Sequence, residues 1–227
     1  MNIAWGITGA GHLLKESYEV FKTLAQKHQI TTFVSRAGEE VLRMYGLLDK
    51  LGEISNGEYL REIIFEREAG ASAPKAGRFL LKKYDALVVS PATSNTVAKI
   101  VRGIADSLIT NVVAQANKSE TPVYIVPVDL SGEMKSPLPY HIDRELCKKC
   151  DACPPKDACP EHAISDQIDL LKCTGCGICI DLCPYDAIKG GNVRLKVRDV
   201  DARNIEELRS MDGITVLEHP SGILTVL

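Results

Sequence analysis

Short apolar runs alternate with amphipathic segments along residues 1–130. The apolar runs end at small or polar residues, as buried strands do, and the segments between them repeat their apolar positions every three or four residues, as helices do. The pattern predicts strands over residues 2–8, 30–35, 86–90 and 122–129, and helices over residues 13–24, 38–46, 96–102 and 106–117. Strands and helices that alternate in this way predict an α/β fold built on a doubly wound parallel sheet.

Three parts of the chain have a weaker pattern. Residues 49–73 support no more than short elements, and Pro74 stands where a helix would begin. Residues 130–139, LSGEMKSPLP, read as a linker. The tail from residue 193 predicts a strand, a helix and a strand, and the pattern leaves open whether this tail completes a second module or packs on the first domain.

An internal repeat follows the expected linker. HIDRELCKKCDAC from His141 matches QIDLLKCTGCGIC from Gln167 at an offset of 26, and CPEHAI from Cys159 matches CPYDAI from Cys183 at an offset of 24. The first copy therefore contains two extra residues, within PPKDA. Two copies of one small unit predict a pseudo-symmetric module. We expect three parts, over residues 1–138, 139–192 and 193–227.

Composition narrows the class of protein. The chain has 227 residues, of which 45% are hydrophobic and 25% charged, and a net charge of −3. This balance is ordinary for a globular protein and gives no general attraction to nucleic acid or to an anionic membrane. The N-terminal sequence lacks the basic start and apolar core of a signal peptide, and no stretch reaches the roughly 20 apolar residues of a membrane span. We expect a cytoplasmic protein.

All eight cysteines lie between Cys147 and Cys183. Thiols this close together in a reducing compartment indicate metal ligands and not disulfides. Each copy of the repeat has three cysteines at two-residue gaps and a fourth before a proline, the spacing of bacterial two-cluster proteins in which the fourth cysteine binds the other cluster. The spacing predicts one [4Fe–4S] cluster on Cys147, Cys150, Cys153 and Cys183, and another on Cys173, Cys176, Cys179 and Cys159.

Zinc is the alternative metal, because it also binds four thiolates, but zinc needs neither the three-cysteine runs nor the paired Cys-Pro. Five residues, in place of the usual three, separate Cys153 from Cys159. We expect a bulge in the loop to absorb the difference. Because such clusters carry single electrons, the first domain should bind a group that exchanges electrons with them.

Three predicted strands end in small or hydroxyl residues, at residues 8–11, 35–36 and 91–96. Ligands of a doubly wound sheet bind beyond the carboxyl ends of its strands, so these loops should converge on one site. GITGAG does not match G-x-G-x-x-G, and no G-x-x-x-x-G-K-[ST] is present, which argues against a dinucleotide or a triphosphate. A single phosphate on hydroxyls and a helix N terminus fits better, and FMN is the redox cofactor with one phosphate. Taken singly, each loop is more often a plain turn or a helix cap, and it is the combination of the three that favours a ligand site.

Both parts of the chain resemble known families. Residues 140–192 resemble bacterial-type ferredoxins, a small α+β module. GITGA, VSRAGEEVL and PATSNTVAKIVRGIADSLITN resemble motifs of the Rossmann-like flavoprotein family that includes the cysteine decarboxylases and the flavin prenyltransferases. The resemblance implies FMN near subunit interfaces, and hence a homo-oligomer, with Ser35 at the phosphate. The candidate cofactor-binding residues are Thr8, Gly9, Ala10, Ser35, Arg36, Ala92, Thr93, Ser94, Asn95, Thr96 and Asn111.

Two departures from the family bear on the activity. Gly77 stands where the cysteine decarboxylases carry an active-site histidine, and VPVDLSGEM replaces their methionine- and asparagine-rich substrate motif. We therefore do not expect decarboxylation, and a decarboxylase or prenyltransferase with an added ferredoxin is a lesser alternative. AWGITGAGHLL joined to a ferredoxin module is most similar to the archaeoflavoproteins and the acceptor-dependent dihydromethanopterin reductases.

The resemblance implies an iron–sulfur flavoprotein oxidoreductase. A low-potential donor, such as a ferredoxin-like protein, would supply electrons through two [4Fe–4S] clusters to FMN and on to a substrate, with dihydromethanopterin as the expected pterin. No residue stands out as an acid or base for that step, and His12 beside the first loop reads as a packed histidine. The main alternative is an electron carrier between protein partners, with no small-molecule substrate.

Overall fold

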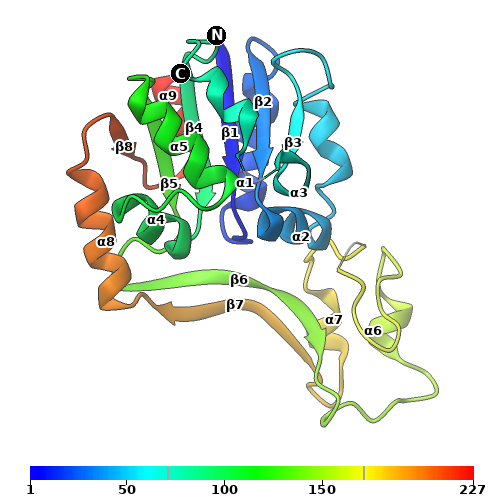
Figure 1. Cartoon of the computed structure of the whole chain (residues 1–227). Helices are drawn as coiled ribbons and strands as arrows, with labels where there is room; N and C mark the ends of the chain where they lie inside the picture. The colour runs from blue at the N-terminus through cyan, green and yellow to red at the C-terminus, as the bar shows by residue number, and fades with distance from the viewer. Residues whose placement is uncertain (71, 171) are drawn as a thin grey trace.

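The computed structural model describes residues 1–70, 72–170 and 172–227; Ala71, and Leu171 in the second copy of the repeat, lie outside the described residues. A six-stranded parallel sheet forms the centre of the molecule, in the order β3-β2-β1-β4-β5-β8 (Figure 1). Its strands are β1 (Asn2–Ile7), β2 (Gln29–Val34), β3 (Ile63–Phe65), β4 (Ala86–Ala92), β5 (Val123–Pro127) and β8 (Ile214–Val216). The order runs outward from β1 in both directions, which confirms the doubly wound α/β fold.

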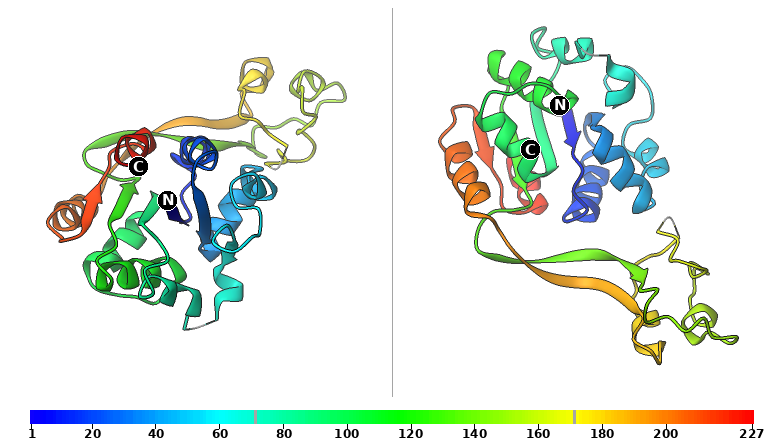
Figure 2. Two further views of the ribbon diagram at one scale, coloured as in Figure 1. Left: turned by 90° about the horizontal axis from the view of Figure 1, so that it is seen from above. Right: turned by 60° about the horizontal axis from the view of Figure 1, so that its bottom comes forward.

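Helices cover both faces of the sheet (Figure 2). The longer ones are α1 (Leu14–Leu24), α2 (Arg36–Met44), α4 (Ser94–Val101), α5 (Leu108–Lys118) and α8 (Asp199–Arg209), and the shorter elements are η1 (Asp49–Glu53), α3 (Glu66–Ala69), η2 (Pro74–Arg78), η3 (Pro220–Gly222) and α9 (Ile223–Val226). Successive strand residues point to opposite faces, so the strands feed two cores. One core contains Trp5 and Phe21, and the other contains Phe33 and Phe79. No helix within the described ranges has both the length and the apolarity that a membrane span needs.

The expected linker over residues 130–139 is wrong. Glu133–Ile142 form a long strand, β6, which pairs antiparallel with β7 (Ile188–Lys196) in a separate two-stranded ribbon. A ribbon strand has an outer edge that needs no N–H partner, so it tolerates the prolines and polar residues that suggest a linker. The far end of the ribbon carries the cysteine module, with the short helices α6 (Pro154–Asp157) and α7 (Ile178–Leu182) (Figure 1).

Two other stretches with a weak sequence pattern form only short elements. Residues 49–73 contain β3, an edge strand too short to show any alternation of apolar and polar positions. Pro74 begins η2 as predicted, but η2 is a 3₁₀ turn of five residues, and residues 79–85 between it and β4 form turns and irregular structure.

The C-terminal tail packs on the first domain, which answers the question that the sequence leaves open. α8 follows β7 and packs against α4, and β8 pairs in parallel with β5 at the edge of the main sheet. η3 and α9 then pack against α1. Both strands of the ribbon are therefore continuous with elements of the sheet domain, β6 through β5 and β7 through α8.

Replacing Phe21 with alanine should strongly destabilise the first core. The Phe21 ring stacks on Trp5 with ring centroids 4.1 Å apart, and both side chains are fully buried. Loss of the ring leaves a cavity, so the free energy of unfolding should fall by about 3–5 kcal/mol. Trp5 is the only tryptophan of the chain, and its fluorescence in a urea titration measures the change.

Leu81→Ala is the control for this substitution, because the Leu81 side chain is 68% exposed. It should change the free energy of unfolding by less than about 0.5 kcal/mol. Equal losses for the two variants would contradict the assignment of Phe21 to the core.

Candidate functional site at the strand ends and in the cysteine module

The carboxyl ends of β1 and β4 meet where the order of the strands reverses. Both strands point with these ends toward the β6–β7 ribbon (Figure 1). The buried hydroxyl of Thr8, directly after β1, donates to the carbonyl oxygen of Pro91 at 2.8 Å and accepts from the N–H of Thr93 at 2.9 Å. One hydroxyl thus joins two of the three candidate loops at the place where folds of this type bind ligands.

The loop after β1 also packs directly on the start of α2. Ser35 caps α2, and its hydroxyl accepts from the N–H of Gly38 at 2.9 Å. Glycine is needed on both sides of this contact, because a Cβ at Gly9 would lie 2.5 Å from the Cβ of Ala37, and a Cβ at Gly38 would lie 2.7 Å from the carbonyl oxygen of Ile7. The loop at residues 35–36 therefore lies against the loop at residues 8–11.

The N terminus of α4 holds most of the remaining candidates. Thr93 caps α4, and its hydroxyl lies 3.1 Å from that of Thr96. Ser94 donates its hydroxyl proton to the carboxylate of Asp129, which follows β5. Asn95 is exposed in the same turn, and Ala92 is fully buried at the end of β4. Hydroxyls, an amide and a helix N terminus therefore gather at the end of β4.

Two acidic residues at this edge were not singled out by the sequence analysis. Glu66, directly after β3, accepts from the N–H groups of Arg36 and Leu108, each at 2.8 Å, so that one carboxylate binds the positive ends of both α2 and α5. Asp129 follows the end of β5, so the expectation that ligands bind beyond the carboxyl ends of the strands would have identified it as a candidate. Glu66 lies in the stretch with no readable pattern, and no local signal points to it.

The other candidates are placed less directly. The side-chain amide of Asn111 donates to the carbonyl oxygens of Ala105 and Ser107, both at 3.0 Å, at the start of α5. Arg36 begins α2 with an exposed side chain, and Ala10 is buried in the loop after β1. Glu66 holds the N terminus of α5 to the other loops through the N–H of Leu108, and the Asn111 side chain takes no part in that contact.

His12 lies at the end of the loop after β1. Its Nδ1 atom is buried and has no hydrogen-bond partner within the described part of the chain. Burial lowers the pKa of its imidazole, and the charges of Glu16 and Asp129 oppose that effect. Gly77, by contrast, lies in η2 with open space where a side chain would stand.

Two pairs of isoleucines build the symmetry of the cysteine module. Ile142 of β6 pairs with Ile188 of β7, and Ile168 pairs with Ile164 in an isolated bridge. The start of each copy of the repeat therefore pairs with the end of the other copy. These four side chains and Cys179 form the module's own small core. The two copies are therefore interlocked. This is the arrangement needed for the fourth cysteine of one copy to bind the cluster of the other.

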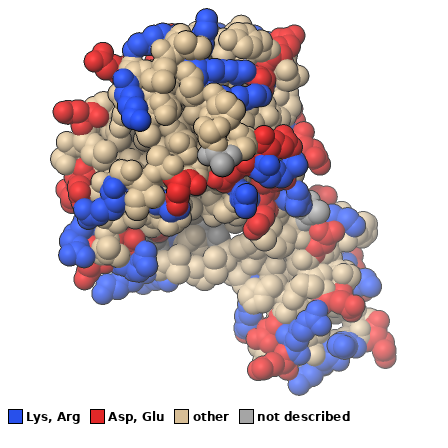
Figure 3. Space-filling model, viewed as in Figure 1, with Lys and Arg blue, Asp and Glu red and all other residues tan. Residues whose placement is uncertain are grey.

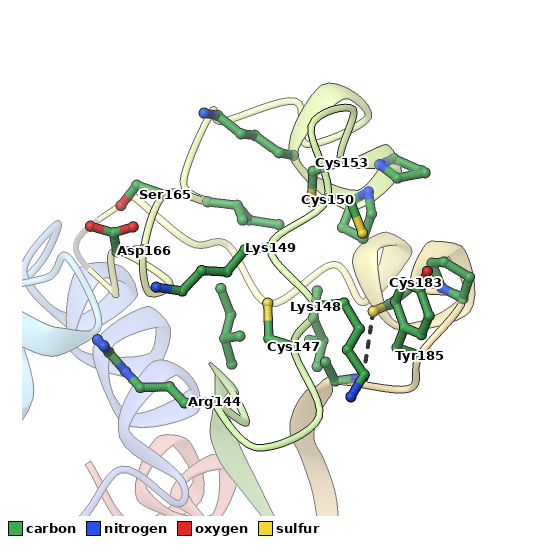
Figure 4. A pocket seen from close by; sticks show the side chains of 18 residues that line it. Arg144, Cys147, Lys148, Lys149, Cys150, Cys153, Ser165, Asp166, Cys183 and Tyr185 are labelled. Carbon is green, nitrogen blue, oxygen red and sulfur yellow. Dashed lines mark hydrogen bonds between the residues drawn. The ribbon is translucent and has the colours of Figure 1, made fainter.

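The eight cysteines divide between two cavities. Cys147, Cys150, Cys153 and Cys183 line a cavity of about 610 Å³ (Figure 4), and Cys159, Cys173, Cys176 and Cys179 line a second, much smaller cavity of about 20 Å³. The N–H groups of Ala187 and Ala163 donate to the sulfurs of Cys183 and Cys159, both at 3.4 Å, so the fourth cysteine of each copy has the same environment. The structure groups the thiols into two sets of four, and four thiolates is the number that one [4Fe–4S] cluster needs.

The arrangement of the thiols suits clusters better than single ions. Burial raises the pKa of the Cys179 thiol, and the neighbouring thiols of Cys173, Cys176 and Cys159 raise it further. Within the described residues, no three Cys, His, Asp or Glu side chains gather around a position for one metal ion. Zinc needs its four thiolates on one ion, whereas a four-iron cluster has each thiolate on a different iron.

The two extra residues of the first copy are absorbed in a helical turn. α6 lies between Cys153 and Cys159, where the N–H of Lys156 donates to the carbonyl oxygen of Cys153 at 2.9 Å and the N–H of Ala158 donates to that of Pro154 at 3.0 Å. The insertion lengthens the path of the chain and leaves Cys159 within its set.

Basic side chains surround the first cysteine cavity. Its lining contains Arg144, Lys148, Lys149 and Lys156, together with Asp166 (Figure 4). On the face of the molecule in Figure 3, side chains of both signs are interspersed over the sheet domain and the module. The positive excess therefore belongs to this cavity and not to the whole face.

A doubly wound sheet with hydroxyl groups gathered at its strand ends, joined to two sets of four cysteines, defines the class of iron–sulfur flavoproteins. Residues 1–138 match the Flavoprotein family and residues 166–189 match the 4Fe-4S binding domain, and the chain belongs to the flavoprotein family.

Relatives of nearly the same length narrow the class further. The chain is 61% identical to "Dihydromethanopterin reductase (acceptor)" of Methanosarcina mazei, over 98% of this chain and 97% of that one, and 50% identical to the protein of the same name in Methanocaldococcus jannaschii, over 99% and 94%. The crystal structure of Burkholderia xenovorans DmrB in complex with FMN, described as a cubic protein cage for redox transfer, covers 99% of this chain and 91% of its own, with a TM-score of 0.65 and 24% identity. That likeness concerns the fold.

The crossed arrangement predicts that Cys147→Ala and Cys183→Ala remove the same cluster. Each variant should keep about four irons per chain in place of about eight, and the reduced proteins should show the same remaining EPR signal. Cys159→Ala and Cys173→Ala should both show the other signal. Ser165→Ala, in the lining of the first cavity, is the control and should keep both. If Cys183→Ala instead matched Cys173→Ala, each copy of the repeat would bind its own cluster.

Proposed function

We propose that this chain is a reductase of the iron–sulfur flavoprotein type, with FMN in the crevice that such sheets form beyond their strand ends and one [4Fe–4S] cluster on each cysteine set. Such clusters carry single electrons and FMN exchanges single electrons for pairs, so together they allow a one-electron donor to drive a two-electron reduction. The observation that carries the proposal is the union in one chain of two four-cysteine cavities with a sheet whose hydroxyl-bearing strand ends point toward the ribbon that carries them.

The residues at the crevice suit a flavin mononucleotide. In this proposal the Ser35 hydroxyl and the exposed guanidinium group of Arg36 bind the phosphate at the start of α2, beside the Arg36 N–H that donates to Glu66. Residues 8–10 border the cofactor, residues 92–96 contact its ring system, and Asn111 contacts it from α5. The glycine contacts between the loop after β1 and α2 support a closely packed backbone around a bound ligand.

Dihydromethanopterin is the substrate that we propose. The name of the two relatives, which match this chain from end to end, supports it. Reduction to the tetrahydro form adds two electrons and two protons to the pterin. The electrons come from a low-potential protein donor of the ferredoxin kind, which the basic lining of the first cysteine cavity would attract if the donor is acidic.

The same proposal includes a homo-oligomer in which the crevice lies near subunit contacts. The DmrB protein, which shares the fold, forms a cage. Exposed apolar side chains on the ribbon and the module offer surface for such contacts: Leu138, Ile178, Leu182, Tyr185 and Leu195.

Anaerobic purification followed by turnover tests the proposed function. The protein should contain about eight irons, about eight sulfides and about one FMN per chain. After reduction it should be reoxidised by dihydromethanopterin, with tetrahydromethanopterin as the product. Reoxidation by a protein acceptor but not by the pterin would show an electron carrier, and a colourless protein containing zinc would contradict the clusters.

Ser35→Ala should weaken the binding of FMN about tenfold or more, because a hydrogen bond to a charged group contributes about 1.5–3 kcal/mol. Calorimetric titration of the FMN-free protein with FMN measures the Kd. Ser210→Ala is the matched control, since it removes a hydroxyl that binds the carbonyl oxygen of Glu207 at the end of α8. The control should leave the Kd within about twofold. Equal affinity in the two variants would place the phosphate elsewhere.

A further inference from the structure

A third cavity, of about 210 Å³, separates the cysteine module from the sheet domain. Tyr140, Cys173 and Thr174 line it from the module, and Lys15 and Tyr45 line it from the sheet domain. The ammonium group of Lys15 donates to the carbonyl oxygen of Thr174 at 3.4 Å. The two parts of the chain therefore meet around this cavity.

The backbone is shaped to hold Tyr140. Gly190 and Gly191, opposite it in β7, have φ values of 124° and 78°. A Cβ at Gly190 would lie 2.8 Å from the Cα of Tyr140, and a Cβ at Gly191 would lie 3.1 Å from its ring. In the cysteine loop, a Cβ at Gly177 would lie 3.3 Å from the Tyr140 hydroxyl. Three glycines from two segments thus make room for one tyrosine between the ribbon and the second cysteine set.

Tyr140 belongs to two cavities at once. It lines both the second cysteine cavity and the cavity between the domains, and Cys173 and Thr174 do the same. The first cysteine cavity shares no lining residue with the cavity between the domains, and it touches the second cysteine cavity through Ile164. In space, therefore, the second cysteine set lies between the first cysteine set and the cavity between the domains.

The opposite wall of this cavity rests on the proposed cofactor loop. A Cβ at Gly11 would lie 2.4 Å from the Tyr45 hydroxyl, so Tyr45 packs directly on the end of the loop after β1. The Lys15 ammonium group lies 6.0 Å from the centre of the Tyr45 ring. The cavity thus has a cysteine ligand on one side and the backbone next to residues 8–10 on the other.

We propose that electrons cross from the module to the sheet domain at this cavity, within one chain, and that Tyr140 positions the second cysteine set for the transfer. The inference rests on the proposed function, since it takes FMN and both clusters as bound. Two single-electron transfers oxidise two reduced clusters by one electron each and reduce one FMN by two, with protons taken up from solvent. Because the rate of electron transfer falls steeply with distance, the second set delivers and the first set receives electrons from the donor protein.

Tyr140→Phe tests the placement of this residue without turnover. Loss of the hydroxyl should shift the reduction potential and the EPR signal of the cluster on the second cysteine set only. That cluster is recognised by its signal, which is absent in Cys176→Ala and present in Cys150→Ala. Tyr185→Phe is the matched control, because Tyr185 lines the first cysteine cavity and should affect the other cluster. The reverse pattern, or no shift in Tyr140→Phe, would overturn the assignment.

Tyr140→Leu tests the transfer itself. In stopped-flow mixing with a reduced two-cluster ferredoxin, its clusters should fill at the wild-type rate, while its FMN should be reduced about tenfold more slowly, as misplacement of reacting groups predicts. Tyr185→Leu should slow the FMN step less than about twofold. Iron and flavin counts show whether each variant is loaded; if Tyr140→Leu fails to load, the same measurement on Tyr140→Phe decides.

The outcomes separate the inference from the function on which it rests. A loaded Tyr140→Leu protein with a wild-type FMN step would overturn the route through this cavity. Wild-type protein whose clusters fill while its FMN stays oxidised would contradict the proposed function instead. An equal slowing in Tyr140→Leu and Tyr185→Leu would show that neither cavity is specific to the transfer, and would also overturn the inference.

Discussion

The buried hydroxyl of Thr8 is the contact on which the geometry of the crevice depends. It binds the carbonyl oxygen of Pro91 in β4 and the N–H of Thr93 just after β4, and the indole N–H of Trp5 donates to the carbonyl oxygen of Ser90 at 2.7 Å beside it. The hydroxyls of Ser90 and Ser17 lie 2.7 Å apart in the same buried layer. Leaving one of these groups unpaired would cost about 1–3 kcal/mol, so the network fixes the two strand ends relative to each other. The capping hydroxyls of α2 and α4 are then positioned by the strands that precede them.

The ribbon extends this fixed geometry to the cysteine module. β6 follows β5, the strand next to the edge of the sheet, and β7 leads through α8 to the edge strand β8, so each strand of the ribbon is joined at one end to an element that the sheet holds. The ribbon passes below the carboxyl ends of the strands and places the module near α2 (Figure 1). A flexible linker would let the module move freely. A hydrogen-bonded ribbon instead presents one particular side of the module to the crevice.

The features that could be predicted from the sequence are those with local signals. The spacing of the cysteines predicts their two sets, and the serine that ends the second predicted strand, Ser35, is a candidate cap that the structure places at the start of α2. The missed features depend on partners that are distant in the chain. β6 becomes a strand only through its pairing with β7, and Glu66 matters only because two helices begin beside it. Tyr140 lies at the end of a segment that reads as a linker, and its role depends on glycines far along the chain.

The two copies of the repeat are alike in backbone and differ where their surroundings differ. At the offset of 26, Tyr140 corresponds to Asp166, and each lines the cysteine cavity on its own side of the module. Lys148 and Lys149 of the first cysteine loop correspond to Thr174 and Gly175 of the second, which line the cavity against the sheet domain. A pair of lysines there would face Lys15, whose ammonium group binds the Thr174 carbonyl, and like charges at that distance repel. Small neutral residues face inward and basic residues face outward, so the repeat has diverged into one side that suits contact within the chain and one that suits an external partner.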